Sequence, residues 1–491
     1  MIEPGQALDS PRLAVEHPHF AAYEQEVDPD SAARIEAGES VLLPDLTLER
    51  RITAGFWIAT ITFVVVLMLI ALERLHNALA ALLGMGLVLA CSAFGTSIPG
   101  MFIFDFERAL SYVNFEVIFL VMGMMIVIAA IEETGIFQWM TYQAYRLSGG
   151  RTWLLVVILM FITAIASALL DNVTTMLLMT PLSIQIALAL GLNPFSILIP
   201  EVLASNVGGI STLIGTPTNI LIGTYAGLSF NNFLVNLTPG VLLAQLALIG
   251  YVILRFRKSW SAGGDEVSET LMERLAEAGQ ITEPVKLRKA GIVFAVMLTG
   301  FVLGERVHLT PAVTAIVGAV VILLWVAPDI ETMMQSVDWT TLMFFIALFI
   351  LVGALQEVGL LSIIAGVISR VVGENLVVTM LVLVWSSALL SGVIANIPFT
   401  AAMLPVVRFL SRTVPGATSN VLFYCLSVGS AMGGNSTLIG ASANMVTTGI
   451  AERAGFRITY VDFLKVGMPA TAVTVVVGSL WLLIRFVLGG G

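Results

Sequence analysis

The sequence predicts an all-α polytopic membrane protein built from two inverted repeats. Three observations support this prediction: a composition typical of bilayer proteins, a set of sequence blocks that recurs in the same order, and a glycine-rich segment that interrupts an apolar run in each copy. Of the 491 residues, 58% are hydrophobic and 11% are charged. Soluble domains average about 25% charged residues, so this chain is not one of them.

Apolar runs recur from Phe56 almost to the C-terminus, and roughly 20 such residues cross a bilayer. They divide the chain into an acidic, mostly disordered tail (1–52), a first transmembrane repeat (53–255), a hydrophilic cytoplasmic linker (256–288) and a second transmembrane repeat (289–488). In the first repeat we expect crossings at about 56–73, 77–94, 113–132, 196–223 and 234–255, and a helical hairpin at 153–170 and 173–190.

The duplication is evident in the sequence itself. The block that begins at Val113 recurs at Val337, and the hairpin sequence "LLDNVTTMLLMTP" aligns with "VIANIPFTAAMLP" at the same offset. The segment "GGISTLIGTPTNIL" from Gly208 recurs as "GGNSTLIGASANMV" from Gly433. Each half has an odd number of crossings whether or not its hairpin re-enters, so the repeats should be inverted. Internal repeats of this kind are typical of secondary transporters, which bind substrate where the repeats meet.

The charge pattern predicts the orientation and the driving force. The basic linker belongs inside, which places the acidic tail and the C-terminus outside, although Arg50 and Arg51 favour the opposite side for the tail. No GxxxxGK[ST] motif is present, so we expect no ATPase domain in this chain and a gradient as the driving force. We expect no cofactor other than Na⁺ or H⁺ as a coupling ion, no structural metal and no nucleic-acid partner.

Ser196–Gly223 is too long for one straight span, and glycines and Pro217 interrupt it. Both residue types weaken a helix, and an unwound backbone is tolerated in a membrane only where protein buries it or where it lines a cavity. The segment therefore predicts a discontinuous helix. Its freed carbonyls could coordinate a cation, and its new helix N-terminus could hold an anion. Close helix packing is the alternative for a single glycine-rich stretch, but two matched copies favour one site formed from both repeats.

The candidate binding residues lie in the two interrupted segments and at the two hairpin tips. They are Asp171, Asn172, Thr174, Thr175, Ser211, Thr212, Gly215, Thr216, Pro217, Asn219, Asn396, Thr400, Asn435, Ser436, Thr437, Gly440, Ser442 and Asn444.

Two carboxylates are the candidate coupling residues, because a charge within the membrane is costly and marks function. Neither is duplicated: Asp171 aligns with Ala395 and Glu201 with Leu426, just as Asn206 aligns with Ala431. Asp171 and Asn172 could bind Na⁺, or Asp171 could carry a proton. The alternative for Asp171 is that it caps the helix that follows.

These motifs resemble the ion transporter superfamily over about residues 55–488. The relevant branch holds the arsenite permeases, the NhaD-type sodium/proton antiporters and the P-protein-like members, which are divalent-anion or citrate-transporter-like permeases, and the P-protein-like members are closest. The resemblance implies a scaffold-and-transport-domain carrier, often a homodimer, with re-entrant hairpins and unwound helices at the site. The second loop departs from the first at Ala441-Ser442-Ala443, and "DNVTT" only approximates the Ser-Asn-Thr motif of dicarboxylate carriers. Substrate identity therefore does not follow from the fold.

The sequence thus predicts a multi-pass protein of the plasma or inner membrane, not an enzyme. Its expected function is secondary active transport of a small anion or oxyanion, such as arsenite or a dicarboxylate, coupled to Na⁺ or H⁺. A Na⁺/H⁺ antiporter of NhaD type is the alternative, and a channel or an intramembrane enzyme is a remote one. The expected partners are the lipid bilayer, a small-molecule or ion substrate, and a second copy in a homodimer.

Overall fold

The computed structural model describes residues 51–489 apart from 73, 96, 99, 262–276, 278, 373 and 374, together with 12–15, 19–21, 23–26 and 34. Nearly all of this part of the chain is helical. Eight of its helices are long and apolar enough to cross a membrane, and further apolar helices are shorter. The all-α polytopic class predicted from composition is therefore confirmed.

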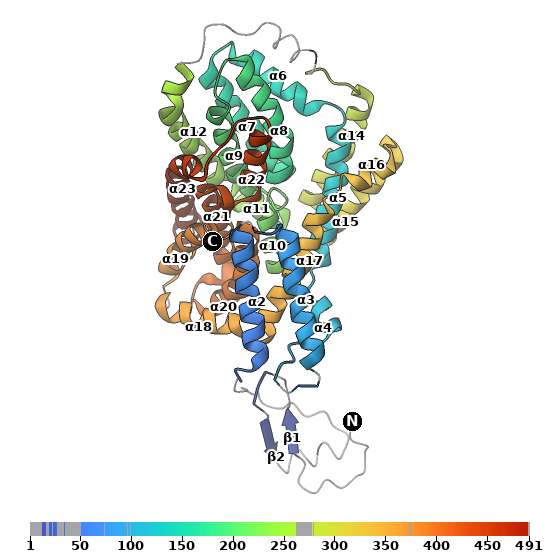
Figure 1. Cartoon of the computed structure of the whole chain (residues 1–491), viewed down its shortest axis with the longest axis vertical. Helices are drawn as coiled ribbons and strands as arrows, with labels where there is room; N and C mark the ends of the chain where they lie inside the picture. The colour runs from blue at the N-terminus through green and yellow to red at the C-terminus, as the bar shows by residue number, and fades with distance from the viewer. Residues whose placement is uncertain are drawn as a thin grey trace.

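The helices follow the same order in the two halves (Figure 1). The first half contains α2 (Ala54–Ala71), α3 (Asn77–Gly95), α4 (Phe106–Ser111), α5 (Phe115–Glu132), α6 (Ile136–Ser148), α7 (Thr152–Leu169), α8 (Asn172–Ala189), α9 (Phe195–Gly208), η1 (Gly209–Ser211), α10 (Pro217–Ala226), α11 (Phe230–Asn236) and α12 (Thr238–Ser261). The second contains α14 (Pro284–Leu303), η2 (Gly304–Val307), α15 (Pro311–Val321), η3 (Ile322–Val326), α16 (Ile330–Gln335), α17 (Trp339–Glu357), α18 (Leu360–Val372), α19 (Leu376–Ser391), α20 (Asn396–Thr413), η4 (Ala417–Ser419), α21 (Val421–Gly433), η5 (Gly434–Ser436), η6 (Leu438–Gly440), α22 (Ser442–Arg453), α23 (Tyr460–Leu483) and η7 (Ile484–Leu488).

The hairpin helices of the two halves lie towards opposite ends of the molecule. In Figure 1, α7 and α8 are in the upper part, whereas their counterparts α19 and α20 lie lower, with α20 towards the opposite end. This is the arrangement that oppositely oriented repeats require. The inversion of the repeats across a membrane stays a prediction.

The helices on either side of the predicted linker are longer than expected. Helix α12 continues to Ser261 and α14 begins at Pro284, so helical turns enter the segment 256–288 from both sides. Basic side chains near a helix C-terminus favour its dipole and can extend along apolar surface, and Arg257 and Lys258 occupy that place in α12. Residues 262–276, the middle of the linker, lie outside the described residues.

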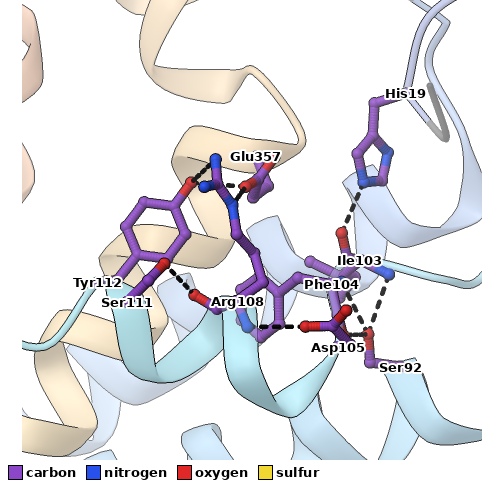
Figure 2. Close-up of polar contacts among 9 residues, drawn as sticks. All are labelled: His19, Ser92, Ile103, Phe104, Asp105, Arg108, Ser111, Tyr112 and Glu357. Carbon is purple, nitrogen blue, oxygen red and sulfur yellow. Dashed lines mark hydrogen bonds and ion pairs between the residues drawn. The ribbon is translucent and has the colours of Figure 1, made fainter. Parts of the chain in front are cut away.

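Part of the N-terminal tail is a small antiparallel hairpin of β1 (Arg12–Val15) and β2 (Tyr23–Glu26), with Arg12 opposite Glu26. His19 Nε2 lies 2.9 Å from the carbonyl oxygen of Ile103, beyond α3, and Figure 2 shows this contact. Apart from 12–15, 19–21, 23–26, 34, 51 and 52, the segment 1–52 lies outside the described residues. The prediction that most of it is disordered therefore stays a prediction.

Glycines allow the hairpins and the interrupted helices to pack backbone against backbone. A Cβ on Gly208 of α9 would lie 2.5 Å from Ala164 Cα of α7, and one on Gly433 of α21 would lie 2.4 Å from the carbonyl oxygen of Ala388 of α19. The same contact is thus made once in each half. It places each hairpin tip directly beside an interruption.

Candidate functional site

Both predicted interruptions are present. Helix α9 ends at Gly208, η1 follows, Thr212 and Thr216 are extended, and α10 begins at Pro217. Proline suits a first helical position, where its missing N–H has no partner to lose. In the second half, α21 ends at Gly433, Thr437 and Ala441 are extended, and α22 begins at Ser442. The discontinuous helix predicted from the sequence is confirmed.

Glycine is required where the two ends of each interruption cross. A Cβ on Gly209 would lie 2.4 Å from the carbonyl oxygen of Gly215, and a Cβ on Gly215 would lie 2.4 Å from that of Gly209. The equivalent distances between Gly434 and Gly440 are 3.0 and 2.6 Å. Because the opposing atoms belong to the backbone, they cannot turn away as a side chain can. The glycines fix the shape of the interruption, and no ligand contact is needed to explain them.

The carbonyls freed by each interruption accept hydrogen bonds from an asparagine of the same segment. Asn219 Nδ2 donates to the carbonyl oxygens of Ile210 and Thr212 at 3.1 and 2.8 Å. Asn444 Nδ2 donates to those of Gly434 and Thr437 at 2.8 and 2.9 Å. Each of these carbonyls therefore already accepts a hydrogen bond from an amide side chain. Coordination of a cation by the same carbonyls stays a prediction, because a carbonyl oxygen has two lone pairs.

Hydroxyl groups join each interruption to the neighbouring hairpin tip. Ser167 of α7 donates to the carbonyl oxygen of Ser205 at 2.8 Å, and Ser391 of α19 donates to that of Ser430 at 2.6 Å. Thr212 donates to the carbonyl of Ala168, and Thr437 donates to that of Gly392. These matched bonds show that Thr212 and Thr437, both predicted to be site residues, hold the site together.

A ladder of buried asparagines connects the two repeats. Asn172 Nδ2 donates to Asn206 Oδ1 at 2.8 Å, and Asn206 Nδ2 lies 2.8 Å from both Asn435 Oδ1 and Asn444 Oδ1. All four side chains are at most 3% exposed. Asn435 also donates to the carbonyl of Leu203. Asn206 is the central member and is absent from the predicted set, although its lack of an equivalent at Ala431 was a signal that could have identified it.

Asp171 caps a helix, as the alternative interpretation predicted. Its Oδ1 accepts hydrogen bonds from the backbone N–H groups of Val173 and Thr174 at 2.8 and 2.9 Å, and Thr175 Oγ1 donates to its carbonyl at 2.6 Å. Its φ of 144° is a conformation that residues other than glycine rarely adopt. The carboxylate thus occupies the N-terminus of α8, and a Na⁺ site with Asn172 stays a prediction.

The second half leaves the corresponding helix N-termini without a side-chain cap. Ala395 precedes α20 and Ala441 precedes α22, whereas Asp171 caps α8 and Thr216 caps α10. Two buried oxygens near the hairpin tips also have no hydrogen-bond partner among the described residues, namely Asn172 Oδ1 and Thr400 Oγ1. Polar groups buried in protein are nearly always paired, so these atoms mark where a ligand would complete the structure.

The remaining predicted site residues surround this centre. Asn396, Ser211, Ser436 and Thr400 are buried, Ser442 and Pro217 are partly buried, and Gly215 and Gly440 are buried within the crossings. Ser436 donates to the carbonyl of Gly433, and Ser427, which was not predicted, donates to Asn219 Oδ1 at 2.6 Å. Among the described residues there is no cluster of three histidine, cysteine or acidic side chains that could hold a metal ion.

Glu201 lies apart from the asparagine ladder. It is fully buried on α9, and Ser183 of α8 donates to its Oε1 at 2.8 Å. Its Oε2 has no hydrogen-bond partner among the described residues. The structure therefore does not bring the two candidate coupling residues together: Asp171 is at a helix N-terminus and Glu201 is inside a helix.

A cavity of about 380 Å³ lies beside the site. Its walls come from α4 and α5, from α17, and from α10 and α20, which begin at the first interruption and at the second hairpin tip. Leu221 of α10 and Ala401 of α20 line it within about two helical turns of those points. The cavity therefore provides an approach to the interrupted helices.

An ion pair between Arg108 and Glu357 joins the two repeats next to Tyr112, which lines this cavity, and Figure 2 shows the pair. Arg108 Nε lies 2.5 Å from Glu357 Oε1, and Tyr112, a cavity residue, donates to the same oxygen at 2.7 Å. Burial and the hydrogen bond to Glu357 raise the pKa of Tyr112, which keeps the hydroxyl protonated as a donor. The Tyr112 ring lies against Gly353, where a Cβ would come within 2.4 Å of it.

A cysteine placed in the cavity should be open to modification from one side of the membrane. In a Cys91→Ser background, we expect Ala401→Cys to react with a small water-soluble maleimide, because Ala401 lines the cavity. Ala347→Cys is the matched control, since Ala347 is fully buried in α17 and is not a cavity residue. If Ala401→Cys stayed as unreactive as Ala347→Cys, water would not reach the cavity.

Comparisons with known proteins agree with this architecture. The family model described as Citrate transporter matches residues 67–423. An uncharacterized transporter of Mycobacterium tuberculosis is 35% identical over 430 residues, covering 87% of this chain and 98% of the relative. The human P protein is 33% identical over 511 residues, covering 88% of this chain and 60% of the relative. The crystal structure of the YdaH transporter of Alcanivorax borkumensis matches with a TM-score of 0.57 and 17% identity, over 84% of this chain and 99% of that one.

Proposed function

Because this chain belongs to the citrate transporter family, a group of transporters and not of enzymes, we propose that it is a secondary active transporter of a small anion or oxyanion, such as arsenite or a dicarboxylate, coupled to Na⁺ or H⁺. It is a multi-pass protein of the cell membrane. The proposal concerns the substrate class, the site and the coupling, and it includes the homodimer implied by the resemblance.

The difference between the helix caps of the two repeats is the observation that carries the proposal. The first repeat satisfies its own helix N-termini with Asp171 and Thr216, and the second places Ala395 and Ala441 at the equivalent positions. An uncapped helix N-terminus presents N–H donors and a partial positive charge, which favour an anion. A substrate carboxylate or oxyanion at α20 and α22 would replace the missing caps.

The groups around these N-termini fit such a substrate. The unpaired Thr400 hydroxyl and the side chains of Asn396 and Ser442 can donate to an anion, and Asn172 Oδ1 can accept from a protonated oxygen or contact Na⁺. We assign Asn435 and Asn444 to the wall of the site, because the ladder holds both amides. These donors are uncharged, so they hold an anion less tightly than a charged side chain would. This suits a carrier, which must release the substrate that it binds.

A Na⁺/H⁺ antiporter is the second candidate, and the unduplicated carboxylates favour it. Asp171 and Glu201 belong to the first repeat only, and antiport of two cations needs carboxylates but no anion site. Sodium held by Asp171 and Asn172 would serve either function. The two functions differ in whether proton movement requires a supplied anion.

The test measures transport by purified protein in proteoliposomes with an internal pH dye. Inward gradients of arsenite, sulfate, citrate and the dicarboxylate succinate, and a Na⁺ gradient without any of them, are applied in turn. Uptake of each solute is measured in parallel. We expect uptake of at least one of the four, because the second repeat leaves two helix N-termini uncapped. A pH change driven by Na⁺ alone, without uptake of any of the four, would identify the antiporter instead.

Ala395→Asp places a carboxylate before α20, at the position that Asp171 has before α8. The N–H of Ile397 can donate to it, whereas Pro398, which stands at the position of Thr174, has no N–H to donate. The substrate anion would then lose charge-assisted hydrogen bonds to this helix N-terminus, worth about 1.5–3 kcal/mol. This loss should raise the KM for the anion about 10- to 100-fold. Asn375→Asp, which places the same charge at the N-cap of α19, is the control and should transport normally. An unchanged KM in Ala395→Asp would remove α20 from the substrate site.

A further inference from the structure

We propose that Glu201, held by Ser183, carries the proton that is coupled to transport. This inference rests on the proposed function and deepens it, because it names the coupling ion and the residue that carries it. The observation behind it is a carboxyl that is completely buried, has one oxygen on a hydroxyl donor, and has the other oxygen without a partner among the described residues.

The second repeat shows that the fold does not require this pair. Ser183 of α8 aligns with Val407 of α20, and Glu201 of α9 aligns with Leu426 of α21. Val407 and Leu426 are both fully buried, so the same two-helix contact is made in the second half with apolar side chains. A serine and a glutamic acid pack no better in this interior than the valine and leucine of the second repeat. The first repeat therefore carries the pair for a reason other than stability.

Among the described residues, no charged group compensates Glu201. The elements packed against α9 are α7, α8, η1, α12, α21, α22, α23 and η5. Of these, α12, α22 and α23 carry charged side chains, namely Arg255, Arg257 and Lys258, Glu452 and Arg453, and Asp462 and Lys465. The other titratable side chains on these elements are Tyr251, Tyr424, Cys425 and Tyr460. Within the described residues, Ser183 is the hydrogen-bond partner of the carboxyl, and the ion pairs do not include Glu201.

A carboxylate in these surroundings would hold a full negative charge with a single hydroxyl donor. Such a charge is not tolerated in an apolar interior, where the group takes up a proton instead. Glu201 is therefore a neutral acid in this conformation, with Ser183 fixing its orientation. When α9 moves and water reaches the carboxyl, the O–H bond breaks and the proton passes to water on that side, which leaves the carboxylate hydrated.

Glu201 is connected through helix α9 to the site that it serves. It occupies the same helix as Asn206, the central member of the asparagine ladder, and Asn435 donates to the carbonyl of Leu203 between them. A movement of α9 therefore affects the carboxyl and the ladder together. This provides a physical route from protonation at Glu201 to the geometry of the substrate site.

The decisive experiment compares proton movement with exchange in proteoliposomes. Glu201→Gln imitates the protonated acid permanently, so we expect exchange of whichever of arsenite, sulfate, citrate and succinate the wild type takes up to continue and the signal of the internal pH dye to be lost. Leu426→Gln, the same polar group at the equivalent site of the second repeat, is the matched control and should retain the pH signal. A second variant, Ser183→Val combined with Glu201→Leu, reproduces the apolar pair of the second repeat and should fold without moving protons.

The outcomes separate the inference from the proposed function. A wild-type pH signal that survives in both Glu201→Gln and the double variant would overturn the inference and leave the transporter intact. Loss of exchange together with the pH signal in folded Glu201→Gln would assign Glu201 to substrate binding and would also overturn it. If the wild-type protein exchanges none of arsenite, sulfate, citrate and succinate and does not change the internal pH under any of the gradients, the proposed function fails and the inference fails with it.

Discussion

Gly215→Ala should abolish transport and prevent normal accumulation of the protein. The added Cβ would lie 2.4 Å from the carbonyl oxygen of Gly209 and 2.8 Å from that of Ser167, and both atoms belong to backbone that is itself packed. Inserting a methyl group into a filled interior typically costs about 1–3 kcal/mol, and here neither neighbour can rotate away. Expression, the melting temperature in detergent and anion uptake would each report the loss.

Gly250→Ala is the matched control for this substitution. Gly250 lies within α12, where an added Cβ meets no atom within 4 Å, and alanine is favoured over glycine in a helix by about 1 kcal/mol. This variant should be as stable as the wild type or more so, and should transport normally. If Gly215→Ala behaved like Gly250→Ala, the crossing of the first interruption would be absent from the folded protein.

Asn206→Ala should have the second large effect, because one side chain joins three others. Asn172, Asn435 and Asn444 would each lose a hydrogen-bond partner while remaining buried. A buried polar group left without its partner costs about 1–3 kcal/mol, which is a large part of a total stability of about 5–15 kcal/mol. We expect a lower melting temperature and loss of anion uptake, since Asn444 is needed to hold the second interruption.

Asn193→Ala makes the same chemical change outside the ladder. Asn193 is exposed and caps the first turn of α9 through the N–H of Phe195, so its removal should cost about 1 kcal/mol at most and leave uptake unchanged. Comparable loss of uptake in both variants would mean that the ladder has no special role. A lower melting temperature in Asn206→Ala with normal uptake would make the ladder structural only.

The parts of the fold that depend on local chemistry could be predicted from the sequence. Continuous apolar runs predict membrane helices wherever they occur, because a bilayer imposes a length and excludes charge. Gly209, Gly215 and Pro217 predict an interruption because each acts on its own backbone. The duplication is visible for the same reason: matching blocks impose the same local structure twice, and the matched hydrogen bonds of Thr212 and Thr437 follow from it.

The contacts between the repeats could not be predicted in this way. Asn206 reaches Asn435 and Asn444 across 229 and 238 residues, and nothing in its neighbourhood in the sequence indicates which groups it meets. The sequence left open whether Asp171 binds Na⁺, carries a proton or caps the next helix, and the structure shows that its carboxylate caps α8. The cap depends on the direction of the chain at the tip, which is a property of the folded hairpin.

The sequence by itself determined the membrane class, the two repeats, the interruptions and the residue types that surround them, because these follow from hydrophobicity, proline and glycine at particular positions. Only the tertiary structure decided which polar groups are already paired. In the folded protein, Asn219 and Asn444 donate hydrogen bonds to the freed carbonyls. The N-termini of α20 and α22 have no side-chain caps, and one oxygen of Glu201 has no hydrogen-bond partner among the described residues. The physical reason is that a hydrogen bond depends on two groups meeting at the right distance, and in a duplicated chain those groups come from opposite halves.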